Sequence, residues 1–86
     1  MPELSRFYGI RITMNFVDHG PPHFHATYGD HEAQVKIATG EVIGGDLPRR
    51  AAALVKEWTD LHRSELEANW ARREKLLPLT KIDPLV

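Results

Sequence analysis

The spacing of the apolar residues changes once along this chain, and this change limits the possible folds more than any other feature. Before Gly44-Gly45, apolar residues recur at every second position, whereas after Pro48 they recur at steps of three and four. The first spacing is typical of a strand with one buried face, and the second is typical of an amphipathic helix. The sequence therefore predicts an α+β domain in which the strands precede the helical part.

Two prolines divide the strand region. Residues 8–16 alternate, with their apolar members on one side, and this predicts a half-buried strand. Pro21 and Pro22 cannot donate hydrogen bonds to a neighbouring strand, so we expect a stiff loop around them. Alternation resumes at His23 and ends at Gly29-Asp30, where glycine supplies the positive φ that a tight hairpin turn needs.

The hairpin around Gly29-Asp30 has one register that separates apolar pairs from polar pairs. This register pairs Tyr28 with His31, Ala26 with Ala33, Phe24 with Val35, His25 with Gln34 and His23 with Lys36. A second turn, at Thr39-Gly40, pairs Ile37 with Val42 and adds a strand that ends at Gly44-Gly45. We therefore expect a four-stranded antiparallel meander.

The helical part begins near Pro48, because a proline is tolerated in the first turn of a helix. The next glycine or proline is Pro78, so the spacing predicts a long amphipathic helix from Pro48 to Lys75, or two helices with a kink, packed on one face of the sheet. A straight helix of that length measures about 42 Å, against about 30 Å for a nine-residue strand, so its far end must overhang or fold back. The chain of 86 residues is too short for two hydrophobic cores, so we expect a single domain, residues 1–86.

The composition excludes several classes of protein. Eleven lysines and arginines against twelve acidic residues give a net charge of −1, which does not indicate a nucleic-acid or anionic-membrane binder. The chain has no cysteine, so any metal must be bound by imidazole, carboxylate or backbone oxygen. No apolar run approaches the roughly 20 residues that span a bilayer, and the first six residues lack a signal-peptide pattern, so we expect a cytoplasmic protein.

Four of the five histidines lie between residues 19 and 31, and three of them form the strongest candidate site. His23 and His25 are two residues apart in a predicted strand, so their rings leave the same face about 6.5–7 Å apart at the backbone. His19 lies across the proline loop and could close on them as a third nitrogen ligand. Three imidazoles that leave one coordination position open are typical of catalytic zinc. One hypothesis is therefore a divalent metal site, such as a zinc site, formed by His19, His23 and His25.

The same sheet face supports two other interpretations, and the sequence leaves all three open. In a metal-free site, His23 and His25 act as general base and general acid on a phosphodiester, while Lys36 and Arg11 stabilise the charge that develops. This would make a small RNA-cleaving surface. In the third interpretation the face is only solvated or forms a protein interface, because an open sheet with one covered face presents polar residues on the other.

Polar residues also lie along the predicted helix. His62 and Asn69 lie on its apolar stripe, where buried polar groups need hydrogen-bond partners and so can attach the helix to the sheet or a loop. Alternatively, His62 reaches the loop that contains Asp18 and His19 and completes a site there. Arg49-Arg50 lies at the positive end of the helix dipole, where an anion or an acidic partner would compensate the charge.

Several segments together resemble a known family. They are Ser5-Arg6-Phe7-Tyr8-Gly9-Ile10, Asp18-His19-Gly20-Pro21-Pro22-His23-Phe24-His25-Ala26, Leu47-Pro48-Arg49-Arg50, Trp58, Leu61-His62, Glu65-Leu66 and Ile82-Asp83-Pro84-Leu85. Over essentially the whole chain, the sequence resembles the small bacterial proteins of domain-of-unknown-function family 4160. The resemblance implies a partner rather than an activity, because members are typically encoded beside a small protein of domain-of-unknown-function family 2442. Such gene pairs resemble toxin-antitoxin modules or small regulatory complexes.

Two functional hypotheses follow. In the first, the chain is a component of a bacterial toxin-antitoxin-like two-protein module, with a histidine-lined site that binds metal or cleaves RNA. In the second, it is a non-enzymatic protein-binding or regulatory module that acts through its helix and its polar sheet face. Under both, we expect association with the partner protein or as a homodimer, because a domain of this size buries only about 60% of its unfolded surface.

Overall fold

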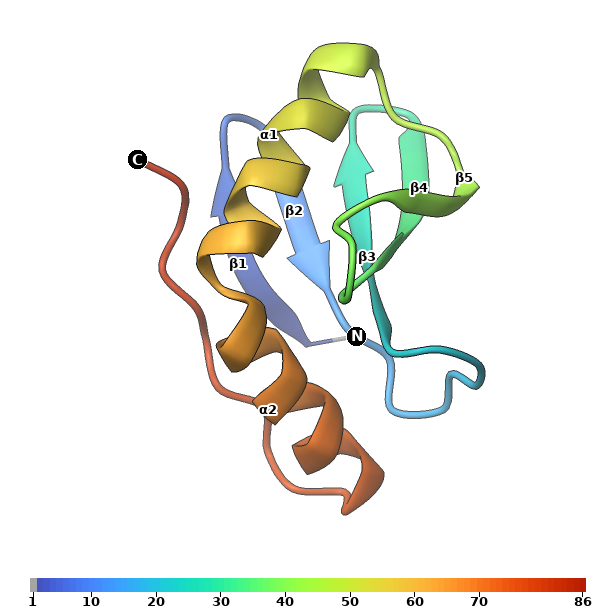
Figure 1. Ribbon diagram of the computed structural model, residues 1–86, viewed down its shortest axis with the longest axis vertical. Coiled ribbons are helices and arrows are strands. Elements are labelled where there is room, and N and C mark those ends of the chain that lie inside the picture. The colour runs from blue at the N-terminus through green and yellow to red at the C-terminus, as the bar shows by residue number, and fades with distance from the viewer. Residues whose placement is uncertain (1) are drawn as a thin grey trace.

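The computed structural model describes residues 2–86 as five strands followed by two helices (Figure 1). The strands are neighbours in chain order and every pair is antiparallel, so the predicted α+β class and antiparallel meander are confirmed. The elements are β1 Glu3–Phe7, β2 Ile10–Thr13, β3 His23–Tyr28, β4 His31–Lys36, β5 Val42–Gly45, α1 Arg49–Leu61 and α2 Arg63–Glu74.

The number of strands is five, and the prediction of four was wrong. Tyr8 and Gly9 both have positive φ, 50° and 80°, and form a two-residue turn, so Phe7 pairs with Ile10. The expected strand over residues 8–16 is therefore divided, and its first two residues belong to a hairpin turn. The spacing of apolar residues did not predict β1, because a register irregularity between Glu3 and Ser5 disrupts its alternation.

The β3–β4 hairpin has the predicted register from His23 opposite Lys36 to Tyr28 opposite His31. The β4–β5 register differs from the prediction, because Val42 pairs with Val35 rather than with Ile37. The turn is longer than expected and closes two residues earlier along β4, where the Lys36 amide donates to the Glu41 carbonyl at 2.9 Å. The Ile37 amide instead donates to Pro22 at 3.1 Å, which ties the end of β4 to the proline loop.

The helical part consists of two helices rather than one long helix. His62 separates them with φ −122° and ψ 26°, and its amide donates to the carbonyls of both Trp58 and Thr59. The Thr59 hydroxyl donates to the Val55 carbonyl at 2.7 Å, a bond of the kind that bends helices. Within the described part of the chain, neither helix is long and apolar enough to cross a membrane.

Figure 1 shows α1 across one face of the sheet, with α2 continuing past the end of the strands and the C-terminal segment running back. Trp58 is the centre of the core, with its ring centroid 5.3 Å from that of Phe7 and 5.7 Å from that of Phe24. The C-terminal segment lies beside β1, where the Ile82 amide donates to the Leu4 carbonyl at 2.8 Å. The core therefore lies between the sheet, α1 and this returning segment.

Candidate metal centre

β3 places His23 and His25 on the sheet face opposite Phe24 and Ala26, as the alternation predicts. Both histidines are buried, with 5% and 6% of their surface exposed. This differs from the solvated polar face that one interpretation of the sequence requires. The rings are 5.5 Å apart between centroids and meet edge to face, so the two imidazoles form a compact pair.

Asp18 joins the two rings. Its Oδ2 lies 2.7 Å from Nε2 of His25 and 3.2 Å from Nε2 of His23. Each of the three residues offers a ligand atom within 4.8 Å of the other two. We call these three residues the Asp-His-His cluster. Asn15 donates to the second oxygen of Asp18 at 3.4 Å and helps to orient the carboxylate.

α2 holds the loop that contains Asp18. The Arg73 guanidinium donates to the carbonyls of Phe16 and Asp18 at 2.8 and 2.9 Å, and Arg73 is buried. It lies 3.7 Å above the Trp70 ring, which in turn lies 5.4 Å from the His23 ring. The cluster is thus positioned by residues about fifty positions further along the chain.

The hydrogen bonds of His23 fix which nitrogen bears the proton. Its Nδ1 lies 2.9 Å from the Pro21 carbonyl oxygen, which can only accept, so Nδ1 must donate. In a neutral ring this leaves the lone pair on Nε2, the nitrogen directed at Asp18. A histidine that donates one N–H to a backbone carbonyl is the usual arrangement around a metal-ligating imidazole.

His25 is less completely bonded. Its Nε2 contacts Asp18, whereas its buried Nδ1 has no hydrogen-bond partner among the described residues. Oε2 of Glu32 lies 3.7 Å from Nδ1, outside hydrogen-bond distance. Glu32 therefore lies where a carboxylate can orient the His25 ring after a small movement.

The electrostatics of the cluster favour an ionised carboxylate. Burial raises the pKa of Asp18, but the hydrogen bond from His25 and the charges of His25 and His23 outweigh it, and the pKa falls below its ordinary value of 3.8. At neutral pH, Asp18 is thus an anion directed at two imidazole nitrogens.

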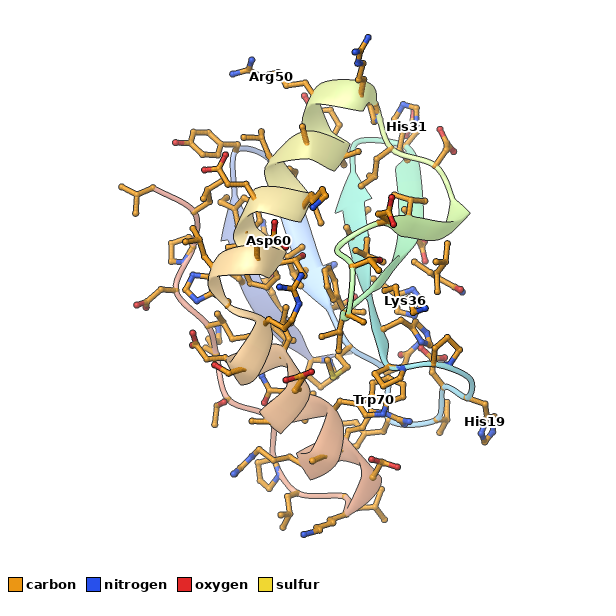
Figure 2. All side chains as sticks on the ribbon, in the orientation of Figure 1. His19, His31, Lys36, Arg50, Asp60 and Trp70 are labelled. Carbon is orange, nitrogen blue, oxygen red and sulfur yellow. The ribbon has the colours of Figure 1, made fainter. Side chains whose placement is uncertain are left out.

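The other residues proposed from sequence lie at different distances from this cluster. His19 is exposed, and Figure 2 shows it at the outer rim of the loop, so Asp18 takes the place expected for it. Lys36 is opposite His23 on β4, as predicted, and is partly buried. Arg11 lies on β2 opposite Thr27, which is two residues beyond His25 on β3. Its Nε donates to Glu3 at 3.0 Å.

His62 and Asn69 are engaged elsewhere. The His62 ring contacts Trp58, and its Nδ1 lies 2.6 Å from Glu65. Asn69 is fully buried and exchanges hydrogen bonds with the backbone of Thr80 at 2.8 and 2.9 Å. These contacts agree with the expectation that both residues have hydrogen-bond partners and attach the helix to another part of the fold. Asn69 attaches α2 to the C-terminal segment.

From the sequence, Asp18 was expected only to belong to the loop beside the site, and Arg73 and Trp70 were not expected to contribute to it. The position of Asp18 beside His19 was the signal that it could be a ligand, since carboxylates and imidazoles both ligate zinc. The signal for Arg73 was its spacing of three from Trp70, which places both on one side of a helix.

The donor set fits a divalent transition-metal ion. Two imidazole nitrogens and one carboxylate oxygen are common ligands of zinc and of non-haem iron, and both sites retain open positions. Donors on one tetrahedral zinc ion lie roughly 3.4 Å apart, given ligand distances of about 2.1 Å. The two contacts of Asp18 Oδ2 with the imidazoles, 2.7 and 3.2 Å, are shorter than that spacing, so the ligand atoms must move apart by about 0.2–0.7 Å to hold the ion.

Comparisons with known proteins agree with the sequence resemblance. A family model described as "Domain of unknown function (DUF4160)" matches residues 9–71, which include all of β2 to α1 and most of α2. Neither the curated proteins nor the solved structures contain a match to the chain.

Proposed function

The chain belongs to the DUF4160 family, and we propose that it is a divalent metal-binding protein whose ligands are Asp18, His23 and His25. The proposal rests mainly on one observation, the position of a single Asp18 oxygen within 3.2 Å of both Nε2 atoms. Zinc is the ion that best suits two imidazoles and a carboxylate in a compact group.

The hydrogen bonds of His23 support a bound ion. Without one, His23 must donate from both nitrogens, to Pro21 and to Asp18, and only an imidazolium can do this. A metal ion replaces the proton on Nε2, keeps the Nδ1 donor to Pro21 and satisfies the carboxylate. Metal binding therefore uses the hydrogen bonds already present in the fold.

Three protein ligands leave one coordination position for water or substrate. When bound, zinc would acidify that water and so supply a nucleophile at neutral pH. The protein holds the ligands rigid and largely excludes solvent from both rings, which are at most 6% exposed. This burial favours metal binding over the metal-free cleavage of RNA, because a phosphodiester needs direct access to both imidazoles.

We propose further that the chain is the metal-binding component of the bacterial two-protein module that its family resemblance implies, and that it acts in the cytoplasm. The family match supports only the resemblance from which this assignment starts. In this role the partner protein supplies the group that reaches the open coordination position.

The experiment is zinc titration of metal-stripped protein by isothermal calorimetry. We expect one zinc ion per chain, and loss of binding in His23→Ala and His25→Ala. His31→Ala is the matched control, because His31 pairs with Asp46 at the opposite end of β4 from the cluster, and it should bind like the wild type. Circular dichroism of each variant separates lost binding from lost folding.

Failure to bind one equivalent of zinc in the wild type contradicts the proposal. Equal loss in His31→Ala and in the cluster variants would also contradict it, because the ion would then bind elsewhere.

A protein-binding role has one specific observation in its favour. β5 is the outermost strand of the sheet, and no further strand pairs with it among residues 2–86. Its side chains Val42 and Ile43 are 37% and 47% exposed. Open strand edges with apolar residues pair readily with another chain, so the second candidate function is homodimerisation through β5.

A further inference from the structure

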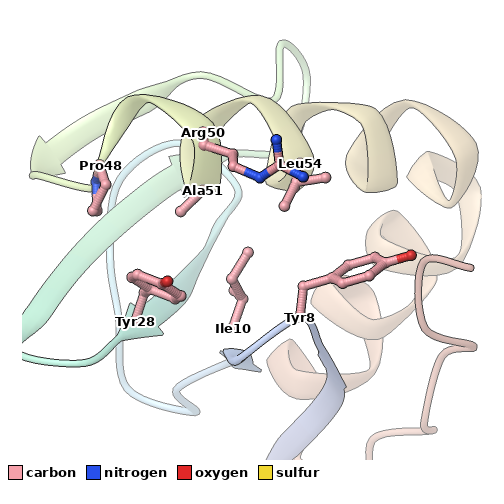
Figure 3. Close-up of a pocket in the computed structure, with 7 residues that line it drawn as sticks. All are labelled: Tyr8, Ile10, Tyr28, Pro48, Arg50, Ala51 and Leu54. Atoms are coloured by element: carbon pink, nitrogen blue, oxygen red, sulfur yellow. The ribbon is translucent and has the colours of Figure 1, made fainter.

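A concave site lies away from the Asp-His-His cluster. It is a cavity of about 290 Å³ between α1 and the hairpin ends of the sheet (Figure 3). Tyr28, on its wall, is at the opposite end of β3 from His23, about 16 Å away at the rise of an extended strand. The cavity is therefore independent of the proposed metal site.

The lining of the cavity combines an apolar floor with two phenol rings and one cation. Ile10 and Ala51 are buried, and Leu54 is partly buried. Figure 3 shows Tyr8 and Tyr28 on opposite sides of Ile10, with Arg50 across from them on the helix. A few polar groups around an apolar floor are typical of small-ligand sites.

Tyr8 has a backbone conformation that is unfavourable for tyrosine. Its φ of 50° lies in the left-handed region, where a bulky side chain is an outlier and glycine or asparagine is usual in a hairpin turn. Burial of the side chain does not offset this backbone strain, because 59% of Tyr8 is exposed. Strained residues of this kind cluster at binding sites, and this one lines a cavity.

Arg50 supplies an uncompensated positive charge. Among residues 2–86 it forms no ion pair, whereas the arginines at positions 6, 11 and 63 each bind a carboxylate. The first turn of α1 contains no acidic residue, so the positive end of the helix dipole adds to the charge of Arg50. An anion at this side of the cavity would be attracted by both.

We propose that this cavity binds a small organic anion that carries an aromatic ring. The ring packs on Ile10 and Leu54 between Tyr8 and Tyr28, and the anionic group meets the Arg50 guanidinium. A volume of about 290 Å³ lies just below the usual range for small-molecule sites, so it suits a small ligand of one or two fused rings.

The test is an NMR titration of the ¹⁵N-labelled full chain with 1-naphthoate, compared with its uncharged analogue 1-naphthalenemethanol. We expect saturable shifts at Tyr8, Ile10, Tyr28 and Ala51, and about tenfold weaker binding of the neutral analogue, because a charge-assisted hydrogen bond is lost. Arg50→Gln should weaken naphthoate binding by a similar factor. Arg49→Gln, which removes the adjacent arginine outside the cavity, should leave the affinity unchanged.

Tyr8→Asn separates a binding role from a structural one. Asparagine tolerates positive φ better than tyrosine, so the variant should unfold at the same urea concentration as the wild type or a higher one. Its affinity for naphthoate should nevertheless fall severalfold. The proposal is overturned if the wild-type shifts do not saturate, if Arg49→Gln and Arg50→Gln weaken binding equally, or if Tyr8→Asn binds as the wild type does.

Discussion

Asp18 is the residue that both imidazoles of the cluster share, and its ionisation should influence stability in acid. The hydrogen bond from His25 and the charges of the two histidines depress its pKa below 3.8 against the opposing effect of burial. The carboxylate of Asp18 takes up its proton at a higher pH in the unfolded chain than in the folded chain. The ionised carboxylate therefore makes its full contribution to the free energy of unfolding above pH 3.8. This contribution is lost as the pH falls through the lower, folded pKa.

We therefore expect Asp18→Asn to lower the stability of the metal-free protein at pH 6, and the difference from the wild type to narrow as the pH falls below 3.8. Urea unfolding at pH 6, 4 and 3 measures this. A difference that grows toward pH 3 would contradict the assignment of Asp18 as the ionised member. Thr27→Ala, on β3 beside His25 but outside the cluster, is the control for general acid sensitivity.

Residue-level patterns in the sequence located the candidate site but did not specify all of its members. The H-x-H spacing correctly placed His23 and His25 on one face, because side-chain direction alternates strictly along a strand. No comparable rule exists for the loop, so the sequence could not decide whether Asp18 or His19 turns inward. That choice depends on Arg73, which fixes the Asp18 carbonyl from a distant helix.

At the scale of elements, α2 acts as a support for the cluster. Arg73 makes two hydrogen bonds to the loop backbone and stacks on Trp70, which contacts His23. Arg73→Met keeps much of the apolar length of the side chain and removes both donors. Each lost hydrogen bond from a charged group contributes about 1.5–3 kcal/mol.

We expect Arg73→Met to lower the free energy of unfolding by about 3–6 kcal/mol and zinc affinity by about tenfold, because Asp18 loses its fixed position. Arg72→Met is the control, since Arg72 donates to Pro78 and not to the loop. Denaturant unfolding and calorimetric zinc titration measure the two effects. Equal zinc affinities of the two variants would show that α2 does not position the cluster.

The open edge of β5 leads to a prediction at the same scale. If two copies pair through this strand, Ile43→Lys should convert a dimer into a monomer, because edge lysines block strand pairing. Light scattering coupled to gel filtration measures the mass. Leu61→Lys alters another exposed apolar residue, on α1, and should leave the mass unchanged. A wild-type monomer at high concentration would exclude this mode of association.

The elements differ in how well sequence patterns predict them. The β3–β4 hairpin was predicted in full, because its turn, its alternation and its cross-strand pairs all agree. β1 was missed for two reasons: a register irregularity disrupts its alternation, and its turn places a tyrosine where glycine or asparagine is usual. The break at His62 has no glycine or proline signal, and the bond from Thr59 to Val55 that accompanies it forms only in the folded helix.

For the whole molecule, bound zinc should raise thermal stability if it binds only the folded state. At a free concentration one hundred times Kd, the gain is about 2.7 kcal/mol. In a domain of this size each kcal/mol raises Tm by about 4–8 °C, so we expect a rise of at least 10 °C. Scanning calorimetry with and without a chelator measures it, and a rise of the same size in His25→Ala would assign the effect to other sites.

The two margins of the sheet are not equivalent. The returning segment around Ile82 occupies the β1 side, whereas the β5 side is open. A molecule with a single available margin can join one neighbour, after which both margins of the pair are closed. Chains that meet in this way cannot grow into fibres, so the protein can present apolar strand residues at high concentration without polymerising.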